Sequence, residues 1–359
     1  MTTMKRLISL LTALALMLCV VACGGAASST APAVPAASGE TAPAAPAGEK
    51  LAMKVATTGN DKHQYTIAAQ FFADKVAEIS GGLVEATLYP NSSLGSEREM
   101  AEGVKMGSIE MTIVTSDGAL PSFVPETQVL SIPYLFATKE EAYYALDTYL
   151  QDAIAPKFEE QGMYHLGFYE LGFRHFTTNN KAIKTAADMQ GQSIRVQEAP
   201  IWFALADSLG FIATPIAFNE LYTALQQGTV DGQENPIASI SSSAFDEDQK
   251  YMCLDGHTLG AIQIVITDNG WNKLSAEQQG WIKEAAAYAQ EAQRQAVTDM
   301  EATMLEGIKA NGCAVEENPD IASFQEATAD LYLKEEVKAL VNPELVEGVR
   351  AAVEEFKTK

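Results

Sequence analysis

Residues 190–236 read QGQSIRVQEAPIWFALADSLGFIATPIAFNELYTALQQGTVDGQENP, and this stretch decides the fold class. A short apolar strand is expected over residues 193–196, and two helices are expected over residues 200–209 and 219–227. The second helix ends at Gly228. Strands that alternate with helices through short connections are typical of an α/β fold, so we expect this class for the chain.

Arg195 lies inside the short apolar strand of this stretch. An arginine that points inward from such a strand needs a carboxylate partner, because an unpaired buried charge is costly. A neighbouring Asp or Glu of the protein is one possible partner. The carboxylate of a bound ligand is the other, and the planar guanidinium would bind it through two parallel hydrogen bonds. The residues alone leave both alternatives open.

The alternation of strands and helices extends to both sides of this stretch. Ser96 is expected to cap a helix that runs to about Met106, with Glu99 at the capping-box position. The other expected elements are strands over residues 51–57, 83–89, 109–115, 164–169 and 259–267, and helices over residues 65–80 and 140–149. This pattern predicts a largely parallel sheet, and 359 residues are enough for two domains or one large one.

A very long helix is expected near the end of the chain. Ser275 is its predicted N-cap, and residues 276–310 are rich in alanine and glutamine with few helix breakers before Gly307. A helix of roughly 35 residues spans about 50 Å, which exceeds one small domain. We therefore expect this helix to lie across two domains.

The first residues have the pattern of a bacterial lipoprotein signal. Lys5 and Arg6 precede an almost unbroken apolar run over residues 7–22, which is short for a membrane span but normal for a signal peptide. Small Ala22 then precedes Cys23, so we expect residues 1–22 to be removed and Cys23 to carry the lipid anchor. A buried N-terminal helix that contains Cys23 is the alternative, which this order of features disfavours.

Residues 23–49 are dominated by Ala, Pro, Ser and Gly and contain no aromatic residue. Such a segment buries too little apolar area to fold, so we interpret it as a tether that lifts a domain off a membrane. Without residues 1–22 the chain has 22 basic and 47 acidic residues, a net charge of −25. This charge excludes nucleic acid as a partner, whereas a few buried arginines can still bind a small anion.

Motifs of common enzyme classes are missing from the sequence. It has no glycine-rich phosphate loop, no HExxH and no G-x-S-x-G, and its four histidines have no metal-ligand spacing. We interpret the histidines as ordinary surface or packing residues, and we expect no cofactor and no metal. Beyond the signal region only Cys253 and Cys313 remain, and we expect two buried free thiols although export permits a disulfide.

Several further segments support one family resemblance. The most specific are residues 231–236, DGQENP, and the helix before them; the others are residues 88–95, LYPNSSLG, 107–112, GSIEMT, 132–136, IPYLF, and 172–177, GFRHFT. Together these closely resemble the DctP-like substrate-binding proteins of tripartite ATP-independent periplasmic (TRAP) transporters. The resemblance covers nearly all of residues 50–359.

This resemblance implies a two-domain α/β fold of the periplasmic-binding-protein type, with a ligand cleft between the domains and a long helix that spans them. Domain I would comprise residues 50–171 and 261–300. Domain II would comprise residues 172–260 and 301–359.

The resemblance also assigns roles to individual residues. Arg195 matches the arginine that pairs with the substrate carboxylate, and Arg174 matches a second arginine that supports it. Asn235 matches an asparagine that hydrogen-bonds the same carboxylate, and Phe218 matches an aromatic residue that lines the cleft. Further candidates, at positions where relatives differ by substrate, are Thr57, Thr115, Glu198 and Trp202, with His63 and Gln64 as weaker ones.

The function implied is that of an extracytoplasmic, lipid-anchored receptor and not of an enzyme. It would capture a small organic carboxylate by hinged closure and deliver it to the TRAP membrane permease subunits. No second cation is evident for a C4-dicarboxylate, so a sugar acid or a hydroxy or keto acid is favoured. Two alternatives stay open, a receptor that reports to a signalling partner and an exported enzyme that acts on carboxylates.

Overall fold

The structure is a computed structural model that describes residues 50–359. The predicted signal peptide, the anchor at Cys23 and the tether over residues 23–49 lie outside the described residues. Within the described part, no helix has the length and apolar character needed to cross a membrane.

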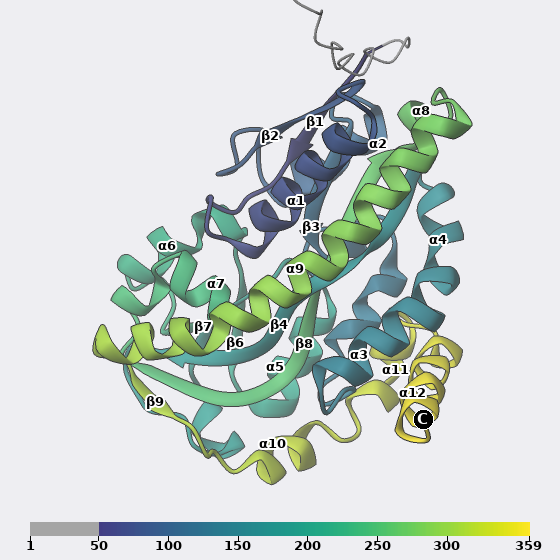
Figure 1. The fold of residues 1–359 in the computed structure, drawn as a ribbon. Coiled ribbons are helices and arrows are strands. Elements are labelled where there is room, and N and C mark those ends of the chain that lie inside the picture. The colour runs from purple at the N-terminus through teal and green to yellow at the C-terminus, as the bar shows by residue number, and fades with distance from the viewer. Residues whose placement is uncertain (1–49) are drawn as a thin grey trace, which may run out of the picture. The chain divides into compact units, whose positions relative to one another are not determined.

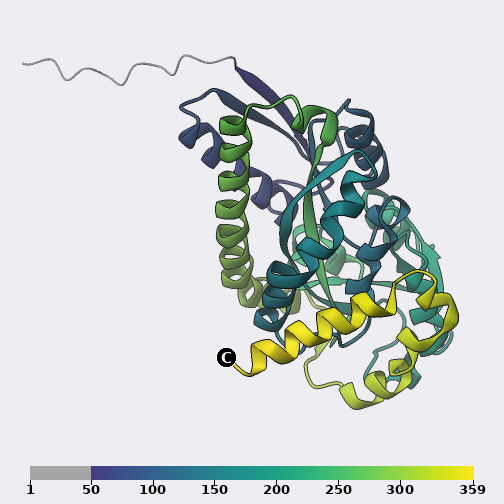
Figure 2. The same ribbon diagram turned by 90° about the vertical axis from the view of Figure 1, so that its right-hand side faces the viewer.

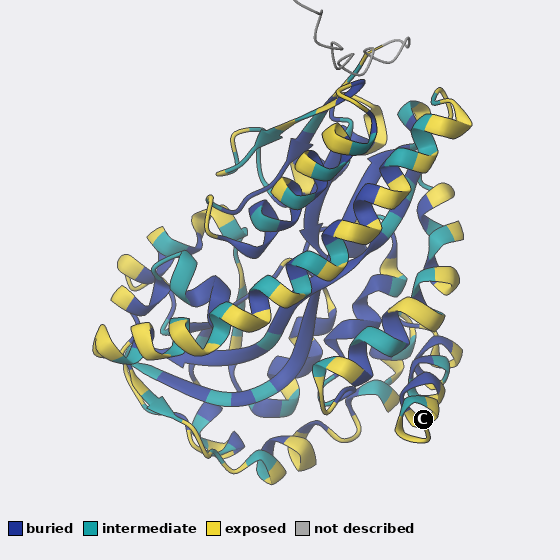
Figure 3. Cartoon of the chain, in the orientation of Figure 1, coloured by how far each residue is buried: buried dark blue, intermediate teal, exposed yellow. Residues whose placement is uncertain are grey.

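A mixed sheet runs through the described residues, with the strand order β2-β1-β3-β8-β4-β7-β5-β6 and with β9 paired to β8. Figure 3 shows that the long central strands are mostly buried, as are β3 and β7, whereas β2, β6 and β9 are largely intermediate or exposed. The strands are β1 (Leu51–Ala56), β2 (Val84–Tyr89), β3 (Met111–Thr115), β4 (Met163–Thr178), β5 (Ser193–Val196), β6 (Ile212–Pro215), β7 (Gly232–Pro236), β8 (Tyr251–Thr267) and β9 (Ala314–Glu316).

The expectation of a largely parallel sheet is correct for the two ends of the sheet and wrong for its centre. At one end β1 pairs in parallel with β2 and β3, and at the other β5 pairs in parallel with β6 and β7. The pairings β3–β8, β4–β8 and β4–β7 between them are antiparallel. The centre therefore consists of two long strands that run in opposite directions and connect the two parallel parts (Figure 1).

These two central strands are much longer than the sequence pattern predicts. Strand β4 has 16 residues and β8 has 17, where we expected residues 164–169 and 259–267. Their pairing shifts register at three places, two of which adjoin Gly167 (φ +146°) and Gly172 (φ +116°). Each shift interrupts the alternation of apolar residues, so the pattern identifies only part of each strand.

Twelve α-helices accompany the described sheet. Ser96 and Glu99 form the predicted capping box of α2, while the expected helix over residues 140–149 is α3 followed by one π turn, Leu146–Leu150, and then α4. The helices are α1 (Gln64–Ile79), α2 (Glu97–Met106), α3 (Lys139–Ala145), α4 (Gln151–Glu159), α5 (Ile201–Leu209), α6 (Phe218–Gln226), α7 (Ile237–Ser242), α8 (Asp268–Trp271), α9 (Ala276–Ala310), α10 (Ile321–Thr328), α11 (Glu335–Lys338) and α12 (Pro343–Lys357).

The predicted long helix is confirmed as α9, which has 35 residues. Ser275 caps it through a capping box with Gln278. It packs against α1, β4 and α7, so it contacts elements from both ends of the sheet. Figure 1 shows it passing diagonally in front of the sheet, and Figure 2 shows it upright along one side of the molecule.

Three apolar clusters form the core of the described residues. One joins α1 and the inner face of α9 to strands β1, β3 and β8, including Phe72, Ile264 and Ala289. The largest packs α2 to α5 and α12 on the other side, and the third lies around α6 and α7. Cys253 and Cys313 are buried free thiols, as expected.

Candidate ligand site

Arg174 lies on β4 and is completely buried. Its Nε and Nη2 both donate to the carboxylate of Glu234 on β7, with Nη2 2.8 Å from Oε1. Nη2 also donates to the Glu234 carbonyl at 2.7 Å and to Asn235 Oδ1 at 3.2 Å. Burial alone would lower the pKa of this guanidinium, but Glu234 outweighs it and the pKa is raised. Arg174 therefore has its carboxylate partner within the protein.

Glu234 is in turn held by a buried histidine. His257 on β8 has Nε2 3.4 Å from Glu234 Oε2 and Nδ1 2.7 Å from Asp255 Oδ2. Burial lowers the pKa of His257, but the two carboxylates outweigh burial and raise it to about 9. The imidazole is therefore a cation at neutral pH. Arg174, Glu234, His257 and Asp255 form a continuous buried chain of alternating charge.

Arg195 lies on β5, only 2% exposed, and its surroundings differ. Its Nε donates to the carbonyl of Ile216 at 2.8 Å, while Nη1 has no partner among the described residues. No Asp or Glu of residues 50–359 forms an ion pair with it within 4.0 Å. Its pKa is lowered to about 10, mainly by burial; Glu234 and Glu97 act in the opposite direction, and nearby Arg174 adds to the lowering. Of the two alternatives for Arg195, the internal salt bridge is not found in this part of the chain.

A narrow pocket lies beside Arg195, and its free volume is about 10 Å³, close to what one water molecule needs. Of the predicted site residues, Arg195, Glu198 and Phe218 line it. Glu198 is exposed at the rim, and Phe218 begins α6 and packs edge-on against His63 at 5.4 Å and Phe245 at 5.8 Å. The lining residues are Glu97, Gly118, Ala119, Arg195, Gln197, Glu198, Ala217 and Phe218.

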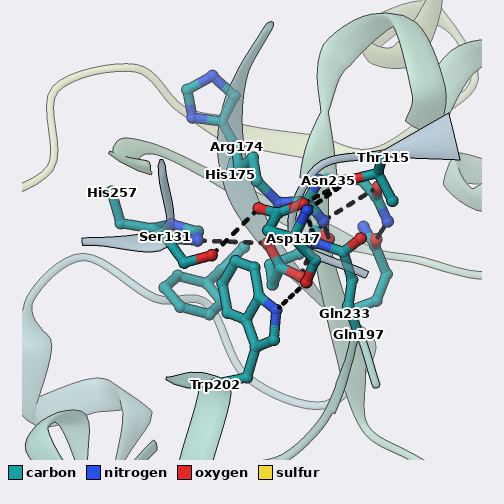
Figure 4. Close-up of polar contacts among 12 residues, drawn as sticks. Thr115, Asp117, Ser131, Arg174, His175, Gln197, Trp202, Gln233, Asn235 and His257 are labelled. Carbon is teal, nitrogen blue, oxygen red and sulfur yellow. Dashed lines mark hydrogen bonds and ion pairs between the residues drawn. The ribbon is translucent and has the colours of Figure 1, made fainter. Parts of the chain in front are cut away.

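Asp117 is a buried acceptor at which several side chains converge (Figure 4). Its Oδ1 accepts hydrogen bonds from Gln197 Nε2 at 3.0 Å and from the Thr115 hydroxyl. Its backbone carbonyl accepts one from Trp202 Nε1 at 3.0 Å. The Trp202 ring in turn lies 5.5 Å from Cζ of Arg174. Thr115 and Trp202 therefore make their polar contacts within the protein and support the pocket from behind.

The remaining predicted residues are not brought to the pocket wall. The Thr57 hydroxyl lies 3.2 Å from that of Thr66, and Asn235 donates to Gln233 while it accepts from Arg174. The weaker candidates also make their polar contacts within the protein: His63 caps α1, and Gln64 Nε2 donates to the Leu171 carbonyl at 3.1 Å and to the Ser239 hydroxyl at 3.3 Å. Each of these side chains is buried.

The histidines mostly follow the expectation of ordinary packing. His63, His165 and His175 are buried, and burial lowers the pKa of each to between about 3 and about 4. His165 stacks on Phe158 at 5.1 Å. His257 departs from the expectation, because it joins the buried charged chain. Among residues 50–359, no group of three or more His, Cys, Asp or Glu side chains is arranged to hold a metal ion.

Sequence reasoning missed three residues of the site. Glu97 lines the pocket, but in the sequence it looks like an ordinary acidic residue in the first turn of α2. Gln197 and Asp117 carry no motif at all. The available signal was positional, since Gln197 and Asp117 both follow the carboxyl end of a strand, where ligand sites of α/β folds gather.

Comparisons with known proteins agree on one family. The model of the bacterial extracellular solute-binding proteins, family 7, matches residues 55–338. A solute-binding protein of Verminephrobacter eiseniae is 36% identical over 273 residues, which are 76% of this chain and 81% of that protein.

Two crystal structures of TRAP periplasmic solute binding proteins have the same fold. The one from Bordetella bronchispeptica, with density assigned to pantoate, is 36% identical with a TM-score of 0.80. The one from Polaromonas sp. JS666, bound to D-erythronate, is 34% identical with a TM-score of 0.81. Each comparison covers 84% of this chain and 99% of the other. This chain belongs to the family 7 bacterial extracellular solute-binding proteins, the TRAP receptor family that its sequence resembles.

Proposed function

We propose that this protein captures a small hydroxylated monocarboxylate and that Arg195 binds the carboxylate. The observation that carries the proposal is that Arg195 is buried without a carboxylate of its own in the described chain, while Nη1 has no hydrogen-bond partner. An isolated buried cation is costly, and a ligand carboxylate would offset that cost through two charge-assisted hydrogen bonds.

The class of acid is supported by the composition of the pocket. Among its lining residues Arg195 is the one cation, whereas Glu97 and Glu198 are acidic. A single cation suits one carboxylate, and the acceptors suit hydroxyl groups. Pantoate and D-erythronate, assigned to the two structural neighbours, are both hydroxylated monocarboxylates.

The transport role follows from the family. We propose that residues 50–171 with 261–300 and residues 172–260 with 301–359 close on the ligand as two domains, and that the closed form docks on TRAP permease subunits. Cys23 would hold the receptor on the outer face of a bacterial membrane. A Cys23→Ser variant should then leave the membrane fraction without losing affinity for the acid.

Calorimetric titration with D-erythronate and pantoate tests the proposal. Hydrogen bonds to charged groups contribute about 1.5–3 kcal/mol each, so Arg195→Ala should weaken binding by roughly two to four orders of magnitude. Arg195→Lys should also weaken it, because a point charge replaces a fork. Arg350→Ala, which removes a surface arginine stacked on Tyr332, is the matched control. Unchanged affinity in Arg195→Ala would contradict the proposal.

A further inference from the structure

Glu97 is a buried acid on the wall of the same pocket as Arg195. It is only 7% exposed, although it is the first residue of α2, a position where acidic residues are normally solvated. The Thr58 hydroxyl donates to its Oε1 at 3.4 Å, and the Tyr65 side chain and the Thr115 backbone also form hydrogen bonds with it. No Lys, Arg or His of the described residues pairs with it within 4.0 Å. Helix α2 does not depend on it for its cap, because Ser96 and Glu99 form the capping box.

Gln197 places a second acceptor beside Glu97. Its Nε2 donates to Asp117, so its Oε1 remains as an acceptor. A Cβ built on Gly118 would lie 3.0 Å from this Oε1 and 3.1 Å from Glu97 Oε2. Both oxygens therefore converge on the same backbone position, and the lack of a side chain at Gly118 leaves the room for them.

The two walls of the pocket thus differ in chemistry. The Arg195 guanidinium offers donors and positive charge, whereas Glu97 and Gln197 offer acceptors. We propose that Glu97, with Gln197, is the specificity-determining residue: it accepts hydrogen bonds from ligand hydroxyl groups and rejects a second carboxylate in their place. This inference rests on the proposed function, because Arg195 must fix the first carboxylate. Burial, which raises the pKa of Glu97 to about 7, agrees with an acid held for a ligand.

The rejection has two physical sources. A carboxylate in place of a hydroxyl has no proton to donate, so both acceptor oxygens would lose their partner on leaving water. Where Glu97 is ionised, the two negative charges would also repel in a buried site that screens them poorly. A hydroxyl group meets neither difficulty, because it donates to one oxygen and carries no charge.

D-erythronate and succinate are a matched pair of four-carbon acids for the test. By calorimetry we expect the wild-type protein to bind D-erythronate at least 100-fold more tightly than succinate. Glu97→Gln keeps the size of the side chain and removes its charge, and it should reduce this ratio at least 10-fold. Glu102→Gln, on the same helix but half-exposed, is the control and should leave the ratio within twofold.

Glu97→Asp is the second variant, and thermal unfolding checks that both variants fold. The Glu97→Asp side chain keeps the negative charge, but it is one methylene shorter, so its oxygens lie farther from the ligand. Affinity for D-erythronate should therefore fall, while succinate should still bind weakly. An unchanged ratio in Glu97→Gln, with binding abolished in Arg195→Ala, overturns this inference and leaves the proposed function standing. A wild-type protein that binds succinate as tightly as D-erythronate also overturns the inference, and one that binds neither acid overturns both.

Discussion

The two buried arginines, Arg174 and Arg195, lie on strands that flank β7 on either side. Arg174 is bound by Glu234 through two side-chain contacts, whereas Arg195 has one backbone carbonyl and no carboxylate among the described residues. The same residue type, buried in the same sheet, therefore has a carboxylate partner in one case and none among the described residues in the other, although Nη1 of each arginine has no hydrogen-bond partner there. Burial of an arginine indicates a binding site only when its partner is missing.

The pKa values of the two arginines are shifted in opposite directions. Glu234 raises the pKa of Arg174 against the effect of burial, while burial lowers the pKa of Arg195 to about 10. Arg174 thus contributes to the stability of the folded state as part of a pair. Arg195 has no such pair among the described residues, so its buried charge should cost stability, and the proposed ligand carboxylate would offset that cost.

Replacing each arginine by methionine should separate these two roles. It should also give the largest change in the free energy of unfolding. Arg174→Met leaves Glu234 buried without its main cation, so the free energy of unfolding should fall by about 3–5 kcal/mol. Arg195→Met removes an unpaired buried charge, so stability should stay the same or rise while binding of D-erythronate is lost. Denaturant unfolding measures the first quantity, and calorimetry the second. Equal loss of stability in both variants would contradict the comparison.

The sequence predicts those parts of the molecule that depend on local patterns. Arg195 was placed on a strand that the structure confirms, α9 has the predicted bounds, and α6 begins one residue earlier than predicted, at Phe218. These predictions rest on local patterns, namely helical caps and apolar periodicity, which the chain obeys over long runs.

Contacts between segments far apart in sequence were not predictable. The partner of Arg174 lies 60 residues away, and no local rule shows which of 47 acidic residues it is. Glu97 faces Arg195 from a helix nearly a hundred residues earlier. The antiparallel centre of the sheet was missed for a related reason, because register shifts at glycines hide the length of β4 and β8.

Raising the pH should weaken the interaction of His257 with Glu234, the carboxylate that binds Arg174. The pKa of His257 is raised from 6.5 to about 9 by Asp255 and Glu234, so its contribution to stability is complete below pH 6.5 and is lost as the pH rises through 9. Between pH 7 and pH 10 the free energy of unfolding should fall by about 2 kcal/mol from this group. Denaturant unfolding at the two pH values measures it.

A pair of histidine variants isolates that effect. His257→Gln should remove the loss between pH 7 and pH 10, although it lowers stability at pH 7. His165→Asn should keep the loss, because burial lowers the pKa of His165 to about 3 and the group does not titrate in this range. If the pH dependence persists unchanged in His257→Gln, another group carries it and the charge of His257 does not stabilise the buried carboxylates in this way.

The smallest effect is expected for Trp202, which contacts Arg174 and, through Asp117, the residues beside Arg195. Trp202 lies over Arg174 and donates to the carbonyl of Asp117, whose carboxylate orients Gln197 on the Arg195 side. Trp202→Phe keeps an aromatic face for Arg174 and removes the N–H, so stability should fall by about 1 kcal/mol for the lost hydrogen bond. Trp281→Phe on α9 controls for the smaller ring. Because the bond joins residues of the two proposed domains, its loss should also weaken D-erythronate binding a few-fold by favouring the open form. Weaker binding without any loss of stability would instead place Trp202 in direct contact with the ligand.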